Sequence, residues 1–232
     1  MEEILTRLAT TGQSQLRELD VAFTGDTDLT HMDPEILTGA LVKLKTTSWI
    51  LYNVRLSSEQ VTHLFTKISN TEDLRLTKVD LSWPPPVSQV PPAVLTGAIS
   101  RLEEVGFGGS DLTPVQLEAI FTMMANQQPE GSKLKMLGFL GHDLSGISPE
   151  LLLGAIRTLE KLMLFETTLD VVQVNAILCL VTEGPRGRLN KITICHPNIL
   201  GTICQDLLQA ANQAGDLLKM DLGEDSGYIY WG

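Results

Sequence analysis

The sequence predicts an α/β solenoid of successive strand–helix units, because two phrases alternate along the chain at a nearly constant spacing. The first phrase, LTPVQLEAIF at residues 112–121, returns in altered form at 56–65 and 169–178. The second phrase, PEILTGALVKL at residues 34–44, returns at 92–102 and 149–159. Repetition at a fixed period is the signature of an architecture in which each unit packs mainly against its neighbours.

The first half of each unit is predicted to be a strand by apolar residues at offsets 0, +3, +5 and +10, as in Leu102, Val105, Phe107 and Leu112. Offsets +3 and +5 lie on one side of a strand, because successive side chains alternate between its two faces. Units with this full spacing start at residues 102, 134, 159 and 189, and weaker copies start at residues 16, 46, 76 and 217. We therefore expect about eight units with a mean step of about 29 residues.

The second half of each unit is predicted to be a helix by the residues at its start. Thr113 and Pro114 suit the N-cap and the first helical position, and Gln116 stands where a capping box needs a glutamine. Related starts pair Ser57 with Gln60 and Asp170 with Gln173. Apolar residues then follow at helical spacing, which indicates one buried face on each helix.

These phrases and spacings resemble the ribonuclease-inhibitor-like class of leucine-rich repeats, as found in the C-terminal regions of NACHT-containing, NOD-like receptors. The resemblance covers roughly residues 4–222. It implies a right-handed α/β horseshoe, with a parallel sheet on the concave side and helices on the convex side. It also implies protein–protein interaction or ligand sensing in an intracellular, innate-immune-like receptor. The class includes inhibitors and GTPase activators as well, so the alternative is a regulatory domain that activates or occludes an enzyme.

One position departs from the pattern of that class, which places Asn or Cys at offset +8. The residues found there are Thr24, Val54, Pro84, Ser110, His142, Thr167 and Pro197. Val54 and Pro84 have no side-chain group that can hydrogen-bond to the turn. We therefore expect irregular turns around residues 52–56 and 82–90.

The repeat pattern predicts a single leucine-rich repeat domain over residues 1–232. Residues 1–15 are interpreted as an N-terminal helical cap or as a half repeat left by a cut in a longer protein. Residues 16–222 hold the repeats, and residues 223–232 are interpreted as a C-terminal cap. The aromatic residues of that last segment, YIYW, either cover the final repeat or form a terminal binding patch.

Composition and charge argue against several classes of function. The net charge of −11, from 17 basic and 28 acidic residues, disfavours nucleic acid and anionic membranes as partners. The start MEEILTRL lacks the basic and apolar regions of a secretory signal, so we expect a cytoplasmic protein. Cys179, Cys195 and Cys204 are expected to be reduced thiols in the core.

No catalytic motif is recognisable in the sequence. The four histidines share no metal-ligand spacing, and the GFGGS segment at 106–110 lacks the lysine of a phosphate-binding loop. We therefore predict that the protein is not an enzyme and uses no cofactor and no metal ion.

Binding is predicted on the concave side, at strand residues that the core does not need. The partner-binding candidates are Phe23, Tyr52, Trp83, Met136, Leu140, Phe165, Asp80 and Glu104. Large aromatic side chains are enriched at binding hot spots, and the acidic residues favour a basic protein or peptide partner. Glycines at 106, 108, 109, 138 and 141 are interpreted as space for the backbone or a bulky group of that partner.

Overall fold

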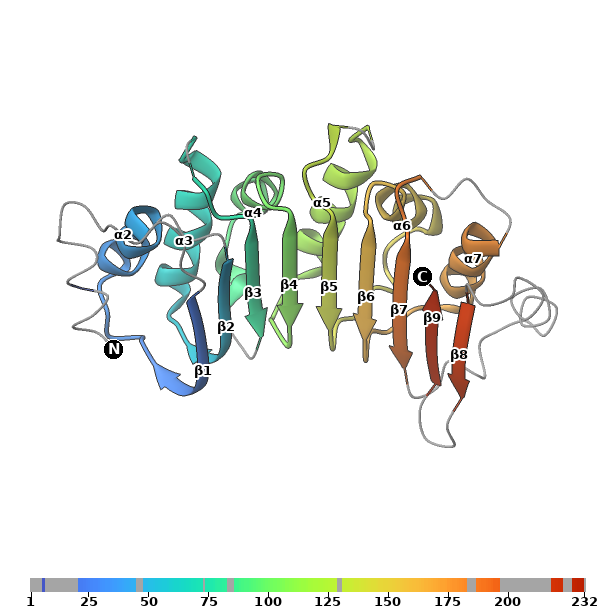
Figure 1. Ribbon diagram of the computed structural model, residues 1–232, viewed down its shortest axis with the longest axis horizontal. Helices are drawn as coiled ribbons and strands as arrows, with labels where there is room; N and C mark the ends of the chain where they lie inside the picture. Colours follow the sequence, from blue (N-terminus) through green and yellow to red (C-terminus); the bar gives the residue numbers. More distant parts are fainter. Residues whose placement is uncertain are drawn as a thin grey trace. The chain divides into compact units, whose positions relative to one another are not determined.

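The computed structural model describes residues 6, 21–44, 48–72, 74–82, 86–128, 131–182, 187–196, 218–222 and 227–231. Strands and helices alternate along these residues, as the repeated phrases predict (Figure 1). The chain forms two compact units, Met1–Gln116 and Leu117–Gly232, which we call the first unit and the second unit.

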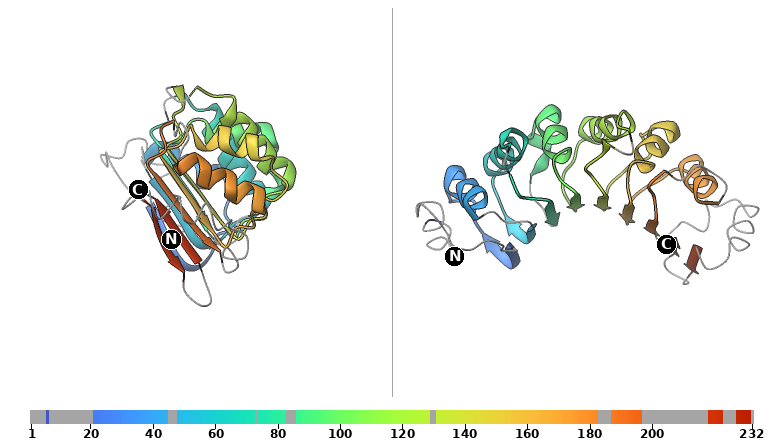
Figure 2. Two further views of the ribbon diagram at one scale, coloured as in Figure 1. Left: turned by 90° about the vertical axis from the view of Figure 1, so that its right-hand side faces the viewer. Right: turned by 45° about the horizontal axis from the view of Figure 1, so that its top comes forward.

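The first unit contains parallel strands that pair in the order of the sequence. They are β1 (Val21–Asp28), β2 (Ser48–Arg55), β3 (Lys78–Ser82) and β4 (Glu104–Gly108). The intervening helices are α2 (Pro34–Leu44), α3 (Ser58–Asn70) and α4 (Pro92–Ile99), with a 3₁₀ turn η1 (Val87–Gln89) before α4. These helices lie on one side of the strands, which leaves the other face without a described helix (Figure 2).

The second unit continues the same alternation. Helix α5 (Pro114–Ala125) leads into it, and β5 (Met136–Leu140), α6 (Pro149–Ile156), β6 (Lys161–Phe165), α7 (Val171–Thr182) and β7 (Lys191–His196) follow. Strands β5, β6 and β7 are parallel neighbours, with α6 and α7 on one side (Figure 2). The predicted alternation of parallel strands with helices is therefore confirmed in both units.

The end of the second unit departs from the parallel series that the spacing predicts. Strand β8 (Leu218–Leu222) falls where the last predicted unit begins, but it does not pair with β7. Strand β9 (Gly227–Trp231) lies between them and runs antiparallel to both (Figure 1). A short connection between two strands favours an antiparallel hairpin, whereas a parallel neighbour needs a longer crossover. The segment interpreted as a cap thus includes a strand.

The core of each unit is formed by rows of apolar residues, a row being a set of residues aligned across neighbouring strands. In the first unit the two rows are Trp49, Val79 and Val105, and Leu51, Leu81 and Phe107. In the second unit they are Leu137, Leu162 and Ile192, and Phe139, Leu164 and Ile194. All these side chains are at most 2% exposed, so the prediction that offsets +3 and +5 face the core is confirmed.

A buried glutamine joins the start of α3 to the turn that precedes α2. The Gln60 Oε1 atom accepts the Ser57 N–H at 2.8 Å, and the Ser57 hydroxyl accepts the Gln60 N–H at 3.2 Å, so the predicted capping box is confirmed. The Gln60 amide nitrogen also donates to the carbonyl groups of Leu29 and Met32, at 2.6 and 2.7 Å. The same side chain therefore caps its own helix and holds the preceding turn.

Two further glutamines repeat this arrangement. Gln116 accepts the Thr113 N–H and donates to the carbonyl groups of Val87 and Val90. Gln173 accepts the Asp170 N–H and donates to the carbonyl groups of Leu144 and Ile147. A glutamate would cap the helix equally well, but it has no N–H with which to reach the earlier turn. This explains why the first phrase carries glutamine at each occurrence.

The glycine of the second phrase lets neighbouring helices approach closely. A Cβ atom at Gly97 in α4 would lie 2.6 Å from the Ser69 hydroxyl oxygen of α3. At Gly154 in α6 it would lie 3.0 Å from the Ala125 Cβ atom of α5. Both glycines are therefore scaffold residues on the helix side.

The backbone at offset +7 is left-handed in four units, directly after the strand in three of them and inside β2 at Asn53. Asn53, Gly109, Gly141 and Glu166 have φ values of 58°, 62°, 76° and 49°. Glycine and asparagine tolerate this region, whereas other residues are disfavoured by about 1–2 kcal/mol. Gly109 and Gly141 are thus explained by backbone geometry, and Glu166 is the exception.

Around residues 52–56, where an irregular turn is expected, strand β2 continues to Arg55. The irregularity there is a shift in the pairing register of β1 with β2 between Thr24 and Thr27. Val54, at offset +8, is buried. Thr167 at the same offset hydrogen-bonds instead, and its hydroxyl donates to the Phe165 carbonyl at 3.0 Å. In the second expected turn, residues 83–85 lie outside the described part of the chain.

Candidate functional site

The strand face opposite the helices carries the candidate site in each unit. In β2, Trp49 and Leu51 are buried, whereas Ile50 is partly exposed and Tyr52 is 52% exposed. Because side chains alternate between the two faces of a strand, Ile50 and Tyr52 point away from the helices. The burial patterns of β4, β5 and β6 show the same alternation. Each unit therefore presents one open strand face.

The first face lies on β2, β3 and β4 of the first unit. Its rows are Ser48, Lys78 and Glu104; Ile50, Asp80 and Gly106; and Tyr52, Ser82 and Gly108. The Lys78 Nζ atom lies 3.0 Å from the Glu104 Oε2 atom, so opposite charges meet across neighbouring strands. This pair is partly exposed and adds at most about 1 kcal/mol to stability.

Asp80 occupies the space that the sequence interpretation left open at Gly106. A Cβ atom at residue 106 would lie 2.9 Å from the Asp80 Oδ1 atom and 3.1 Å from its carboxyl carbon. The glycine therefore accommodates the side chain of its neighbour in β3. The interpretation of Gly106 as empty space for a partner is wrong, because a residue on the adjacent strand already fills that space.

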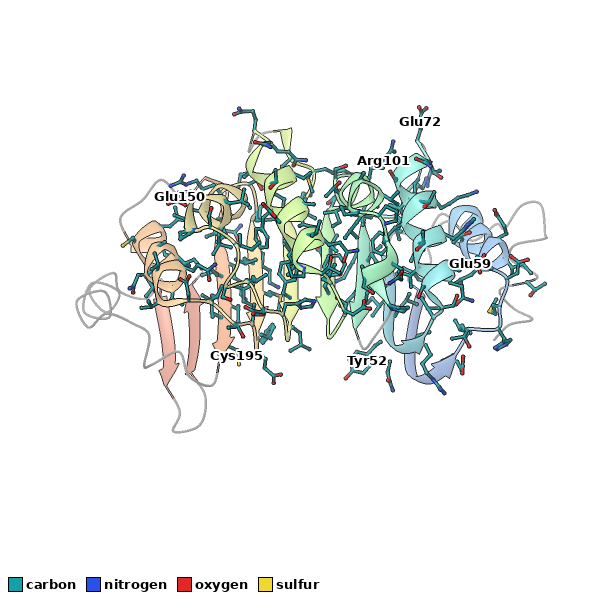
Figure 3. All side chains as sticks on the ribbon, turned by 180° about the vertical axis from the view of Figure 1, so that it is seen from behind. Tyr52, Glu59, Glu72, Arg101, Glu150 and Cys195 are labelled. Carbon is teal, nitrogen blue, oxygen red and sulfur yellow. The ribbon has the colours of Figure 1, made fainter. Side chains whose placement is uncertain are left out.

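Tyr52 is the aromatic candidate of the first unit whose side-chain exposure the structure describes, and it is 52% exposed. It stands near the carboxyl end of β2, immediately before the left-handed Asn53 (Figure 3). A tyrosine offers a large apolar ring and a hydroxyl group with little conformational freedom to lose on binding. Tyr52 is thus suited to anchor a partner, as the sequence predicts.

The second face lies on β5, β6 and β7 of the second unit. Its rows are Met136, Lys161 and Lys191; Gly138, Met163 and Thr193; and Leu140, Phe165 and Cys195. Thr193 is buried, and the apolar side chains among them are all partly exposed. Cys195 lies near the carboxyl end of β7 (Figure 3). The second face therefore combines an apolar surface with two lysines and carries no carboxylate.

The two lysines of the second face are direct neighbours across β6 and β7. Lys161 is partly exposed and Lys191 is exposed, and their Cα atoms are register partners. Among the described residues no carboxylate forms an ion pair with either of them. Glu160, adjacent to Lys161 in sequence, pairs with Arg188 at 2.6 Å. Like charges directly opposite each other in a sheet are destabilising.

The structure brings the predicted residues together in two groups. Tyr52, Asp80 and Glu104 lie on the first face, and Met136, Leu140 and Phe165 lie on the second. Lys161, Met163 and Lys191 occupy outward strand offsets in the sequence but were not among its chosen candidates. What could have revealed them is that two consecutive units carry lysine at offset +2.

Two predicted residues do not join these groups. Phe23 is in register with Leu51, a buried position, while Thr24 is the partner of Tyr52. Strand β1 therefore places Phe23 at the equivalent of offset +5, two positions from the offset that the sequence assigns. Trp83 lies outside the described residues.

The cysteines also differ from the prediction that they lie in the core. Cys179 is exposed on α7, because the buried side of that helix is formed by Val174, Ile177, Leu178 and Val181. Cys195 is partly exposed on the second face. Cys204 lies outside the described residues.

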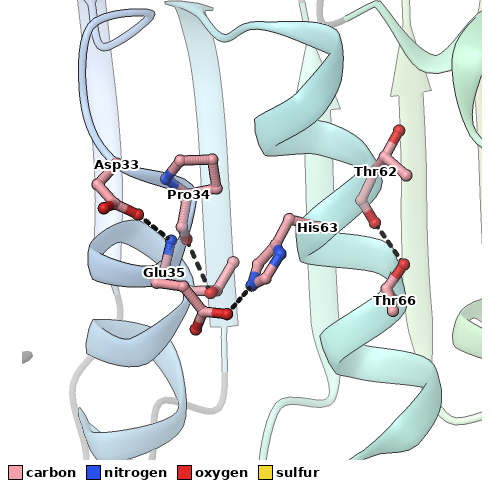
Figure 4. Close-up of polar contacts among 7 residues, drawn as sticks. Asp33, Pro34, Glu35, Thr62, His63 and Thr66 are labelled. Atoms are coloured by element: carbon pink, nitrogen blue, oxygen red, sulfur yellow. Dashed lines mark hydrogen bonds and ion pairs between the residues drawn. The ribbon is translucent and has the colours of Figure 1, made fainter.

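A polar groove of about 650 Å³ lies on the helix side of the first unit. Its lining residues are Ser58, Glu59, Thr62, His63, Thr66, Pro86, Ser88, Gln89 and Asp111. The Glu35 Oε1 atom of α2 lies 3.3 Å from the His63 Nε2 atom, and the Thr66 hydroxyl donates to the Thr62 carbonyl at 2.8 Å (Figure 4).

Asp111, which also lines this groove, is hydrogen-bonded to Ser88. Burial acts to raise the pKa of its carboxyl group, but hydrogen bonds from the Ser88 hydroxyl and N–H outweigh this effect and lower the pKa. Ser88 belongs to η1, the turn whose carbonyl groups Gln116 also holds. The proline-rich segment before α4 is thus tied to the scaffold at its end.

Three features of the described residues bear on other classes of function. No group of three or more His, Cys, Asp or Glu side chains is placed to hold a metal ion among them. No helix in the described part of the chain is long and apolar enough to cross a membrane. The chain matches no protein-family model, and no curated protein is significantly similar to it.

Proposed function

We propose that this chain is a protein-binding module of an intracellular receptor and that it recognises its partner through the open strand faces. The observation that carries this proposal is the exposure of large side chains on a face that no described helix covers, with Tyr52 as the clearest case. The resemblance of the repeats to those of NOD-like receptors supports the receptor context, including a role in ligand sensing. An innate-immune role and a cytoplasmic location belong to this proposal.

The distribution of the candidate residues favours recognition over catalysis. Each face spreads its side chains over three neighbouring strands, so a partner that lies along the face contacts several repeats at once. Binding energy spread in this way suits a sensor or scaffold better than an enzyme activator, which depends on one compact cluster of residues.

The test is capture of partners by face variants and by matched control variants. Tyr52→Ala and Phe165→Ala remove one aromatic ring from each face. Val115→Ala and Val172→Ala remove exposed apolar side chains from the first turns of α5 and α7. Quantitative mass spectrometry then compares the proteins that each variant retains from an extract of the source cells.

We expect the wild type and both valine variants to retain the same partner. Truncation of a hot-spot aromatic residue costs about 2 kcal/mol or more, so at least one face variant should retain roughly thirtyfold less of it. A set of captured proteins that is unchanged in both face variants would contradict binding through the open faces.

A further inference from the structure

We infer that the second face binds an acidic, partly apolar peptide segment of its partner, with the carboxylates of that segment on Lys161 and Lys191. This inference rests on the proposed function and specifies the partner of that same surface. It replaces the basic partner that the acidic residues of the sequence favour by an acidic one at the second unit.

The first argument is that charged side chains are paired in the first unit but not in the equivalent row of the second unit, among the described residues. In the first unit the row at the start of the strands contains Lys78 and Glu104, which form an ion pair at 3.0 Å. In the second unit the corresponding row contains Lys161 and Lys191 side by side. The scaffold can therefore place opposite charges in this row, yet the second unit holds two like charges that no carboxylate among the described residues neutralises.

The second argument is that the carboxylate of Glu160, the residue before Lys161, is already engaged. The Glu160 Oε1 atom lies 2.6 Å from the Arg188 Nη2 atom, and Arg188 also donates to the Ser132 carbonyl at 2.7 Å. This arrangement pairs the Glu160 carboxylate with Arg188. Within the described part of the chain, the two ammonium groups thus remain available to carboxylates from a partner.

The third argument is the apolar surface next to the lysines. Met163 follows Lys161 on the open side of β6, and Leu140 and Phe165 form the next row. Their partial exposure leaves apolar area that a bound side chain would cover. Methionine also adapts its shape to different partners. The chemistry that fits is a segment with acidic residues followed by leucine-like or aromatic residues.

Glu166 sets the orientation in which the acidic segment binds. It is exposed directly after Phe165, and its N–H donates to the Cys195 carbonyl at 2.7 Å. Its negative charge disfavours a carboxylate at the carboxyl ends of the strands, whereas the lysines favour one at their amino ends. The acidic part of the bound segment therefore lies over Lys161 and Lys191, and its apolar part lies over Phe165.

The test uses a displayed library of random twelve-residue peptides selected on the purified chain. The most enriched peptide is synthesised together with an amide twin, in which every Asp and Glu becomes Asn and Gln. Fluorescence anisotropy then measures the dissociation constants of both peptides for the wild type, the double variant Lys161→Glu/Lys191→Glu and Phe165→Ala. Lys133→Glu is the matched control, because Lys133 is an exposed lysine of the same unit outside the second face.

We expect the selected peptides to be rich in acidic and apolar residues. The double lysine variant should bind the acidic peptide about tenfold or more weakly than the wild type does. The amide twin should bind the wild type about tenfold more weakly than its parent peptide. The control variant should change binding by less than about twofold, as a charge outside the contact should. Circular dichroism checks that every variant is folded.

Three results would overturn the inference: no enriched peptide, enriched peptides without carboxylates, or an amide twin that binds as tightly as its parent. If such a twin still loses affinity in Phe165→Ala, the second face binds peptides and only the acidic preference is wrong. The proposed function itself fails only if the Tyr52→Ala and Phe165→Ala variants both retain as much of the partner captured from cells as the wild type does.

Discussion

The first and second faces are built from strands that the repeat makes equivalent, yet their surfaces differ in both charge and polarity. The first face carries Asp80, Glu104 and Lys78, with the lysine neutralised by Glu104. The second face carries Lys161 and Lys191 among apolar side chains and no carboxylate. The rows beneath them are buried and apolar in both units. The repeat therefore keeps the same core in both units while the outward positions differ.

The strongest test of this comparison is whether truncating an equivalent core phenylalanine destabilises the fold equally in the two units. Phe107→Ala and Phe139→Ala each empty a position that is 1% exposed in the same row of its unit. Each variant should lose about 3–5 kcal/mol of the free energy of unfolding, because a large cavity replaces a packed ring. Urea denaturation monitored by circular dichroism measures the loss. A loss below 1 kcal/mol in only one variant would mean that the cores are not equivalent.

The glutamines test the same equivalence at the helix starts. Gln60→Ala and Gln173→Ala each leave two turn carbonyl groups and one N-cap N–H without their partner. We expect a loss of about 2–3 kcal/mol in each, since buried groups left without a hydrogen bond are costly. The matched Gln→Glu variants should remain destabilised, because glutamate restores the cap but cannot donate to the carbonyl groups. Stability restored to the wild-type value by glutamate would refute a role for the amide N–H.

The left-handed residues distinguish the faces at their carboxyl edge. Glu166→Gly should raise the free energy of unfolding by about 1 kcal/mol, because glycine adopts φ near 49° without steric conflict. Asn53→Gly at the equivalent position should change the free energy of unfolding by only about 0.3 kcal/mol, since asparagine already tolerates this conformation. Thermal and urea unfolding give both values. Equal effects in the two variants would show that Glu166 is not strained.

Charge reversal in the first row should act in opposite directions on the two units. Lys161→Glu converts two like charges into an opposite pair with Lys191, so it should stabilise the fold by about 0.2–1 kcal/mol. Lys78→Glu breaks the pair with Glu104 and adds a third carboxylate to the first face, so it should destabilise the fold by a similar, small amount.

Both effects of charge reversal should shrink when the salt concentration rises from about 0.05 to 1 M, because exposed charges are then screened. Changes of the same sign in the two variants would contradict the difference between the faces. Stabilisation by Lys161→Glu together with weaker peptide binding would show that the lysine pair is kept for recognition and not for folding.

Much of the scaffold could be predicted because its determinants are local and repeated. The offsets of Leu51 and Phe107 predict the core side of their strands, and Ser57 with Gln60 predicts a capped helix, since both depend on neighbours within a few residues. The register of β1 was mispredicted because its apolar residues fit two offsets, and pairing with β2 aligns Phe23 with Leu51. The antiparallel insertion of β9 was also missed, because the choice of strand partner is not local.

The candidate site could be predicted only as a set of positions. Tyr52, Asp80 and Phe165 lie on the faces that the spacing indicates, but the sequence did not show that Asp80 fills the space at Gly106. It also did not show that Lys78 is paired with Glu104 while Lys161 and Lys191 have no ion-pair partner among the described residues. These facts depend on which side chains meet across strands about 25–30 residues apart in the chain.

By itself, the sequence determined the alternation of strands and helices up to β7, the buried side of β2 to β7, and the helix caps. These follow from side-chain periodicity and local hydrogen bonding, which act over a few residues. Only the tertiary structure decided the links from Gln60 and Gln173 to earlier turns, the place of β9, and the chemistry of the two faces. Such features arise when distant segments are brought side by side. A repeat pattern does not predict the contacts and surfaces that its variable positions then form.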